Sequence, residues 1–162
     1  MHGTDVGEVI SVVNLYAIAV DTQRWHLLDR VFTADVEADF GGGHRWQNRD
    51  SLKRDFEMFH AGFLATLHTT TNHEAVVAGT RANCISYVHG RFFSQGSGGR
   101  TMTESGGWYD DELIREQDEW RISRRVCRVV WTGANSAEME LFSLRSEAEA
   151  GRIALLRALE GG

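Results

Sequence analysis

Two short segments carry the residues that could do chemistry in this chain of 162 residues. In the first, YAIAVDTQRW, the carboxylate of Asp21 follows four apolar residues, and a charge that close to a core is costly unless a partner satisfies it. The second, LHTTTNH, begins a strand-like region in which side chains alternate, so His68 and Asn72 are expected on one face and His73 on the other. Imidazole and carboxylate groups commonly carry protons in enzymes, so these residue types favour acid–base chemistry.

The spacing of the histidines argues against a catalytic metal. If His68 and His73 lie on opposite faces of a regular strand, they cannot hold one ion together, and neither HxH nor HExxH occurs. Cys84 and Cys127 form no CxxC pair and are expected to be reduced, buried thiols. We therefore expect no catalytic metal.

Composition limits the partners and the location. Lysine and arginine number 17 against 23 acidic residues, a net charge of −6, which argues against a broad nucleic-acid-binding surface. The N-terminus lacks the pattern of a signal peptide, and no apolar run reaches the ~18 residues of a membrane helix. We expect a soluble, cytoplasmic protein that binds neither nucleic acid nor membranes.

The elements that must position these groups follow from hydrophobic periodicity. Apolar residues at helical spacing predict helices over 5–20, 23–32 and 50–64. From Leu67 onward, β-branched and aromatic residues dominate, and three turn signals separate four long antiparallel runs. The pattern predicts one α+β domain over 1–162, a β-meander on a helical front half. Residues 137–160 are expected to form a C-terminal helical extension that packs against the domain or a subunit.

In this order, the segments LYAIAVDTQRW, FTADVEADF, HTTTN and GGWYDDELIREQDEWRISRR resemble the SnoaL-like family of the nuclear transport factor two superfamily. The resemblance covers residues 5–132. It implies a cone-shaped α+β fold, in which a strongly curved antiparallel sheet wraps helices around a deep apolar pocket. It also implies a homo-oligomer, a dimer or a trimer.

The enzymes of this family include scytalone and bile-acid dehydratases and the hexachlorocyclohexane dehydrochlorinase. In them a histidine on the sheet and an aspartate after the first helix form a proton-transfer dyad, and His68 and Asp21 match these positions. Tyr16 resembles the pocket tyrosine of some dehydratases. The resemblance thus implies a cofactor-independent lyase or isomerase, with dehydration favoured, acting on a hydrophobic oxygenated small molecule such as a polyketide, steroid or terpenoid.

Each site residue also has a structural alternative. Asp21 could cap the second helix, and His68 could be a core histidine bonded to backbone. Tyr16 lies about 140° around an ideal helix from Asp21, so both reach one pocket only if the helix ends near Asp21. The alternative function is a non-catalytic binding module, or a structural subunit like the small subunit of ring-hydroxylating dioxygenases.

Other residues are expected to contact the substrate. The many aromatic side chains of this sequence suit a flat, apolar compound. An arginine of the segment WRISRRVCRVVW could line the pocket. An amide side chain could orient a substrate oxygen. The candidates for substrate binding are Asn72, Trp25, Phe56, Tyr109 and Arg125.

Overall fold

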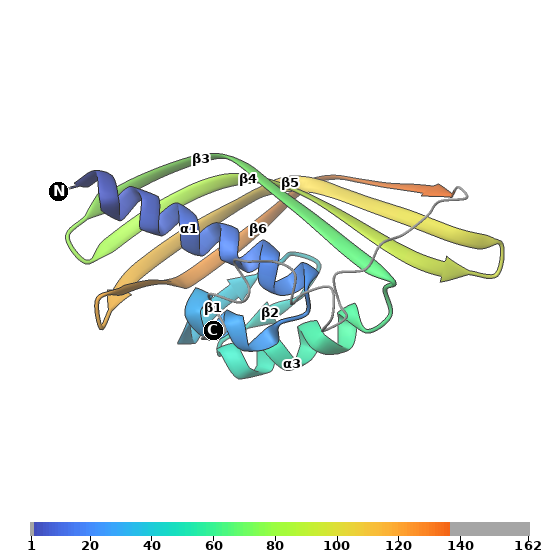
Figure 1. Ribbon diagram of the computed structural model, residues 1–162, viewed down its shortest axis with the longest axis horizontal. Coiled ribbons are helices and arrows are strands. Elements are labelled where there is room, and N and C mark those ends of the chain that lie inside the picture. The colour runs from blue at the N-terminus through green and yellow to red at the C-terminus, as the bar shows by residue number, and fades with distance from the viewer. Residues whose placement is uncertain (1, 137–162) are drawn as a thin grey trace.

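The computed structural model describes residues 2–136 (Figure 1). Its helices are α1 (His2–Asp21), the 3-10 turn η1 (Trp25–Leu27), α2 (Leu28–Val31) and α3 (Arg49–His60). Its strands are β1 (Phe32–Asp39), β2 (Arg45–Trp46), β3 (Ala65–Ala78), β4 (Arg81–Gly96), β5 (Gly99–Glu116) and β6 (Glu119–Ser136). The four expected long strands are confirmed, whereas the expected second helix is reduced to η1 and α2. The helix expected over 137–160 lies outside the described residues.

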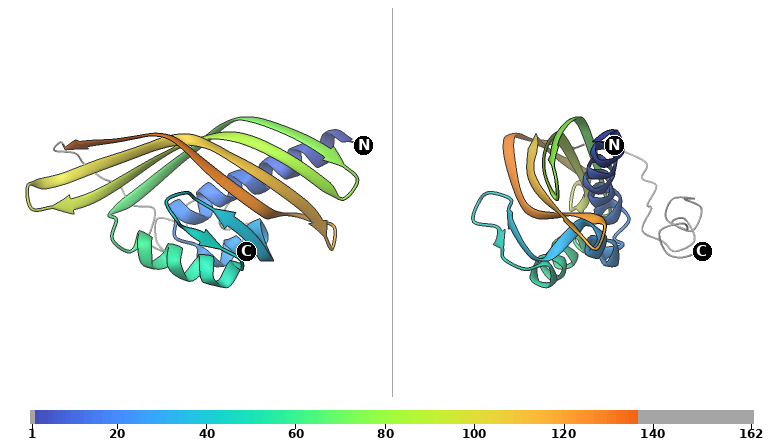
Figure 2. Two further views of the ribbon diagram at one scale, coloured as in Figure 1. Left: turned by 180° about the vertical axis from the view of Figure 1, so that it is seen from behind. Right: turned by 90° about the vertical axis from the view of Figure 1, so that its left-hand side faces the viewer.

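One curved sheet of six strands, in the order β2-β1-β6-β5-β4-β3, wraps around the helices. Figures 1 and 2 show α1 and α3 on its concave side, with β3 to β6 extending beyond them. Neighbouring strands pair antiparallel except β1 and β6, which run parallel. The α+β fold with a curved sheet is confirmed, and the expectation of a wholly antiparallel sheet is wrong at this one pair.

Helix α1 supplies one side of the core and then stops at the position that matters for the site. Val9, Val13 and Val20 repeat at helical spacing, are fully buried and pack with the sheet. Beyond Asp21 the chain turns sharply, because Gln23 adopts a φ of 53°. The backbone N–H of Arg24 closes the end of the helix on the carbonyl of Ala19, at 2.9 Å. The helix therefore ends at Asp21, which is the condition under which Tyr16 and Asp21 can serve one pocket.

Strand β3 contains a bulge that the sequence pattern did not reveal. Its pairing with β4 shifts between Thr71 and Glu74, and Asn72 adopts a φ of 54°, a left-handed conformation that asparagine tolerates. The extra residue reverses the alternation, so Asn72 is exposed and His73 turns to the inner face, which is also the face of His68. The expected placement of Asn72 and His73 on their respective faces is therefore wrong.

A second bulge, between Gly106 and Gly107, bends β5 against β6. A Cβ added to Gly107 would overlap the carbonyl oxygen of Arg128, and one added to Gly106 would overlap the indole of Trp131. A larger residue at Gly107 would therefore require β6 to shift, and one at Gly106 would require the side chain of Trp131 to move. Both glycines line the cavity described below.

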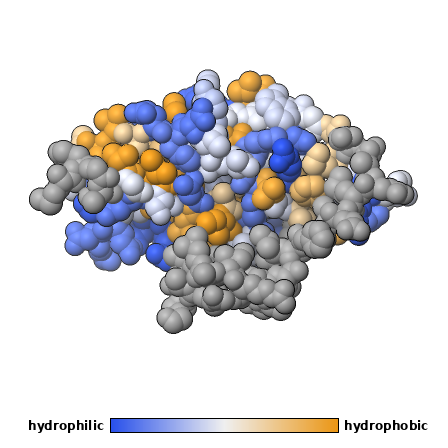
Figure 3. All heavy atoms as spheres, turned by 45° about the horizontal axis from the view of Figure 1, so that its top comes forward, coloured by the Kyte–Doolittle hydropathy of each residue, from blue (hydrophilic) through white to orange (hydrophobic). Residues whose placement is uncertain are grey.

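The outer face of the sheet exposes large apolar side chains, among them Leu67, Ile85, Tyr87, Trp108 and Trp131. The rings of Tyr87 and Trp108, which are paired across β4 and β5, have centroids 6.0 Å apart. Figure 3, in which the top of the molecule comes forward, shows hydrophobic patches among hydrophilic residues. Within the described part of the chain, no helix is long and apolar enough to cross a membrane. The homo-oligomer stays a prediction.

Candidate active site

The carboxylate of Asp21 is bound by three donors from β3. Its Oδ1 lies 2.6 Å from Nδ1 of His68 and accepts a hydrogen bond from the hydroxyl of Thr66 at 3.0 Å. Its Oδ2 accepts the backbone N–H of His68 at 2.7 Å. The side chains of Asp21 and His68 are 9% and 7% exposed. Asp21 therefore faces β3 and His68, and η1 begins without a side-chain cap, so the helix-cap alternative is wrong.

The carboxylate decides which nitrogen of His68 is available. Because Asp21 accepts from Nδ1–H, this hydrogen bond assigns the proton to Nδ1 and leaves the lone pair on Nε2. The ring of His68 lines a cavity of about 410 Å³ between α3, β2 and the inner face of the sheet. Buried carboxylates also stabilise an imidazolium ion, so the same contact would support His68 after it has taken up a proton.

The wall of this cavity is mainly aromatic. Its rings come from α1, the turn after β1, β2, α3, β4 and β5, and belong to Tyr16, Phe40, Trp46, Phe56, Phe59, Phe92 and Tyr109. The space beside His68 depends on Gly90, because an added Cβ there would lie 3.4 Å from Cδ2 of His68 and 3.0 Å from the ring of Phe92. The cavity thus offers an apolar volume beside the ring of His68.

Tyr16 and Tyr109 contribute two phenol groups to the wall. Their hydroxyl groups are hydrogen-bonded to each other, their ring centroids are 5.6 Å apart, and the ring of Tyr16 lies 6.4 Å from that of His68. Burial raises the pKa of both phenols well above the ordinary value of a tyrosine. Both tyrosines are therefore protonated at neutral pH and can donate a hydrogen bond rather than act as bases.

Arg125 does not line this cavity, contrary to the sequence-based expectation. Its Nε and Nη2 bind the two carboxylate oxygens of Asp111, each at 2.7 Å, and both side chains are fully buried. The guanidinium carbon lies 4.3 Å from the ring centroid of Tyr16 and 4.0 Å from that of Tyr109. Burial acts to lower the pKa of Arg125, but the adjacent carboxylate outweighs burial and the net shift is upward. The charged guanidinium of Arg125 thus makes cation–π contacts with the rings of both tyrosines.

The remaining expected site residues divide between the cavity and other places. Phe56 and Tyr109 line it, whereas Trp25 packs against His60, with ring centroids 5.4 Å apart, and is not part of the wall. Asn72 is exposed at the bulge. The expectations for Trp25 and Asn72 as contacts in this cavity are therefore wrong.

Sequence reasoning missed Thr66, although it lies two residues before His68 and alternation places both on one face.

Cys127 lines the cavity, and burial raises the pKa of its thiol to about 11, so this thiol is protonated at neutral pH. Among the described residues, no three His, Cys, Asp or Glu side chains come together as a metal site would require.

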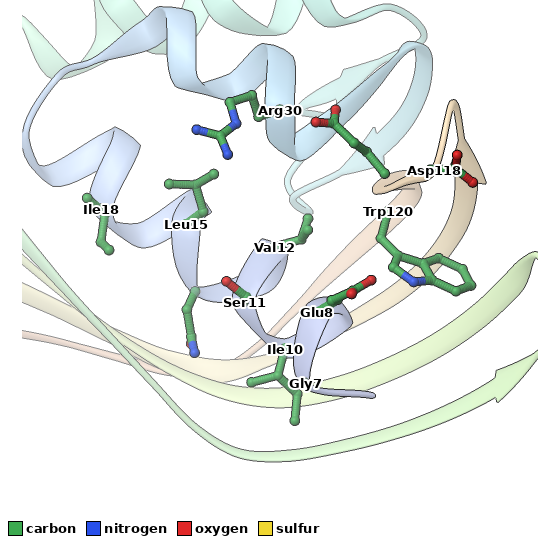
Figure 4. A pocket seen from close by; sticks show the side chains of 12 residues that line it. Gly7, Glu8, Ile10, Ser11, Val12, Leu15, Ile18, Arg30, Asp118 and Trp120 are labelled. Atoms are coloured by element: carbon green, nitrogen blue, oxygen red, sulfur yellow. The ribbon is translucent and has the colours of Figure 1, made fainter. Parts of the chain in front are cut away.

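A larger cavity, of about 520 Å³, runs along α1 (Figure 4). Its apolar wall includes Val12, Leu15 and Ile18, and its charged residues include Glu8 and Arg30. It contains neither member of the Asp21–His68 pair, so the smaller cavity is the candidate active site.

Comparison with known proteins identifies the family of this arrangement. The SnoaL-like domain profile matches residues 2–126. The uncharacterized protein Rv2910c of Mycobacterium tuberculosis is 30% identical over 112 residues, which make up 68% of this chain and 76% of that protein.

Two solved structures share the fold. The Kfla4162 protein of Kribbella flavida aligns with a TM-score of 0.76 and 24% identity, over 82% of this chain and 95% of its own. The hexachlorocyclohexane dehydrochlorinase LinA-type3 from Novosphingobium barchaimii aligns with a TM-score of 0.73 and 15% identity, over 86% of this chain and 96% of its own. Because the profile matches most of the chain and the fold agrees, the chain belongs to the SnoaL-like family of the nuclear transport factor two-like superfamily.

Proposed function

We propose that this protein is a cofactor-independent lyase or isomerase, with dehydration favoured, in which His68 and Asp21 transfer a proton within the aromatic cavity. The observation that carries the proposal is the 2.6 Å contact between Nδ1 of His68 and Asp21, with the ring of His68 in the cavity wall. A sealed core histidine would not line a cavity. The name of the LinA-type3 neighbour, a dehydrochlorinase, agrees with elimination chemistry on this fold.

The reaction follows from the positions of these groups. Nε2 of His68 takes a proton from the carbon next to a carbonyl, and the carbon electrons form a double bond as the bond to a β-hydroxyl group breaks. The imidazolium, stabilised by Asp21, returns the proton to the departing hydroxide, which leaves as water. The hydroxyl of Tyr16 donates a hydrogen bond to the carbonyl oxygen as negative charge develops there. The proposed substrate is a hydrophobic, oxygenated compound of the polyketide, steroid or terpenoid kind.

Proton removal from carbon is common to dehydration, isomerisation and cyclisation, so it can be tested before the substrate is known. We expect the wild type to exchange the α-hydrogens of 2-tetralone for deuterium in D₂O, and mass spectrometry measures this exchange. We also expect it to convert 4-hydroxy-4-phenylbutan-2-one into its conjugated enone, and ultraviolet absorbance measures this conversion. Asp21→Asn should slow both reactions by about 10²- to 10⁴-fold, because the amide neither fixes the tautomer nor stabilises the imidazolium.

Asp35→Asn is the matched control, because Asp35 is an exposed carboxylate on β1. It should leave both rates unchanged. If the wild type catalyses neither reaction although the compounds bind, the non-catalytic binding module becomes the better account.

A further inference from the structure

The described residues that line the His68 cavity carry an uneven charge. Asp55, on α3, is the one acidic residue among them, and they include neither lysine nor arginine. The rest of the wall is aromatic, aliphatic or polar, and its polar part includes the imidazoles of His44, His60 and His68. Asp21 adds a second negative charge directly behind His68. An anionic ligand would therefore meet negative charge at both places and find no guanidinium or ammonium group to pair with.

The carboxylate of Asp55 is held in place and keeps an oxygen for a ligand. Nε1–H of Trp46, another wall residue, donates to its Oδ2 at 2.8 Å. Oδ1 lies 3.4 Å from Nε of Arg54, a side chain that is 66% exposed, and such surface pairs contribute little in water. With 39% of its side chain exposed, Asp55 lies where the cavity meets solvent. Oδ1 can therefore accept a further hydrogen bond.

A series of ring contacts lies between Asp55 and His68. Trp46, the partner of Asp55, contacts Phe56, with centroids 5.3 Å apart. Phe56 in turn lies 6.4 Å from Tyr16, and Tyr16 lies 6.4 Å from His68. Aromatic rings therefore separate the carboxylate of Asp55 from the imidazole of His68 in the cavity wall.

We propose that Asp55 is a specificity-determining residue, which accepts a hydrogen bond from a hydroxyl or ammonium group on the ligand at the end remote from His68. The substrate class is then a neutral or cationic aromatic or alicyclic compound with a donor group at its distal end, and carboxylates and phosphates are excluded. This inference rests on the proposed function, because it takes the His68 cavity as the substrate site.

Three probes of equal ring size test the inference: 2-naphthylmethylamine, 2-naphthalenemethanol and 2-naphthoate, titrated by calorimetry at pH 7. The wild type should bind the amine and the alcohol more tightly than the acid. Asp55→Asn should weaken binding of the amine about tenfold or more, since hydrogen bonds to charged groups are the strong ones. Binding of the alcohol should fall less, because the asparagine carbonyl still accepts, and binding of 2-naphthoate should hold or improve. A loss confined to the amine would identify an ammonium ligand, and a loss of both would identify a hydroxyl ligand as well.

Glu57→Gln is the matched control, because it removes the same charge from an exposed position of α3 outside the cavity wall. It should leave all three affinities unchanged. Failure of the wild type to bind the amine, unchanged binding of the amine in Asp55→Asn, or an equal loss in Glu57→Gln overturns the inference. If only this inference fails, proton exchange by the wild type and its dependence on Asp21 remain. If only the proposed function fails, probe selectivity still follows Asp55 while no exchange is detected.

Discussion

Replacing His68 by glutamine is expected to lower kcat/KM for dehydration of 4-hydroxy-4-phenylbutan-2-one by about 10²- to 10⁴-fold, the usual contribution of a positioned acid–base group. Glutamine is similar in size and can still hydrogen-bond to Asp21, but it offers no nitrogen that can take up a proton at neutral pH. The measurement is the initial rate of enone formation, with the thermal melting curve recorded to establish that the variant is folded.

His89→Gln is the control for this substitution. His89 is also on the sheet and bound to a carboxylate, with Nε2 lying 2.7 Å from Glu104, but it is absent from the cavity wall. Its replacement should leave kcat/KM unchanged. Equal activity of the His68→Gln variant and the wild type would show that His68 is not the base.

The second large effect is expected on stability, at the pair of Asp111 and Arg125. Asp111→Leu leaves a fully buried guanidinium without its partner, and such a loss costs about 3–5 kcal/mol. The double variant Asp111→Leu/Arg125→Met removes both charges together and should recover much of that loss, because apolar residues of similar volume can replace a buried ion pair. Urea unfolding at pH 7 measures the free energy of unfolding of each variant.

A neighbouring pair on the same two strands provides the control. Arg124 and Glu112 are 3.0 Å apart, but their side chains are 43% and 47% exposed. Replacing either should change the free energy of unfolding by about 1 kcal/mol or less. If Asp111→Leu is as stable as the wild type, or the double variant is less stable than that single variant, the buried pair does not have the role assigned to it.

The sequence was informative wherever a local pattern decides the structure. The spacing of Val9, Val13 and Val20 predicted α1, and the turn signals predicted the four long strands. Both predictions were possible because an element that buries one face repeats apolar residues at a regular spacing along the sequence. The charge at Asp21, directly after an apolar run, correctly indicated a partner inside the protein. The identity of that partner required the family resemblance, since Asp21 and His68 meet through tertiary packing.

Other parts of the site depend on features that the alternation of side chains along a strand does not reveal. A single bulge residue moved Asn72 outward and His73 inward, although the strand itself was predicted. Arg125 was expected near a ligand, but cross-strand pairing brings Asp111 opposite it and uses its charge in the core. The positions of Asp55 and Gly90 in the wall likewise follow from tertiary packing, which brings α3 and β4 to the same cavity.

The most direct test of the central claim is the protonation state of the His68 ring, measured by long-range ¹H–¹⁵N correlation spectroscopy on ¹⁵N-histidine-labelled protein. The account predicts that the neutral ring carries its proton on Nδ1, where Asp21 accepts it, and leaves Nε2 bare. In Asp21→Asn the preference for the Nδ1–H tautomer should weaken or disappear. A ring that carries its proton on Nε2 in the wild type would contradict the account, because the nitrogen facing the cavity could not then act as the base.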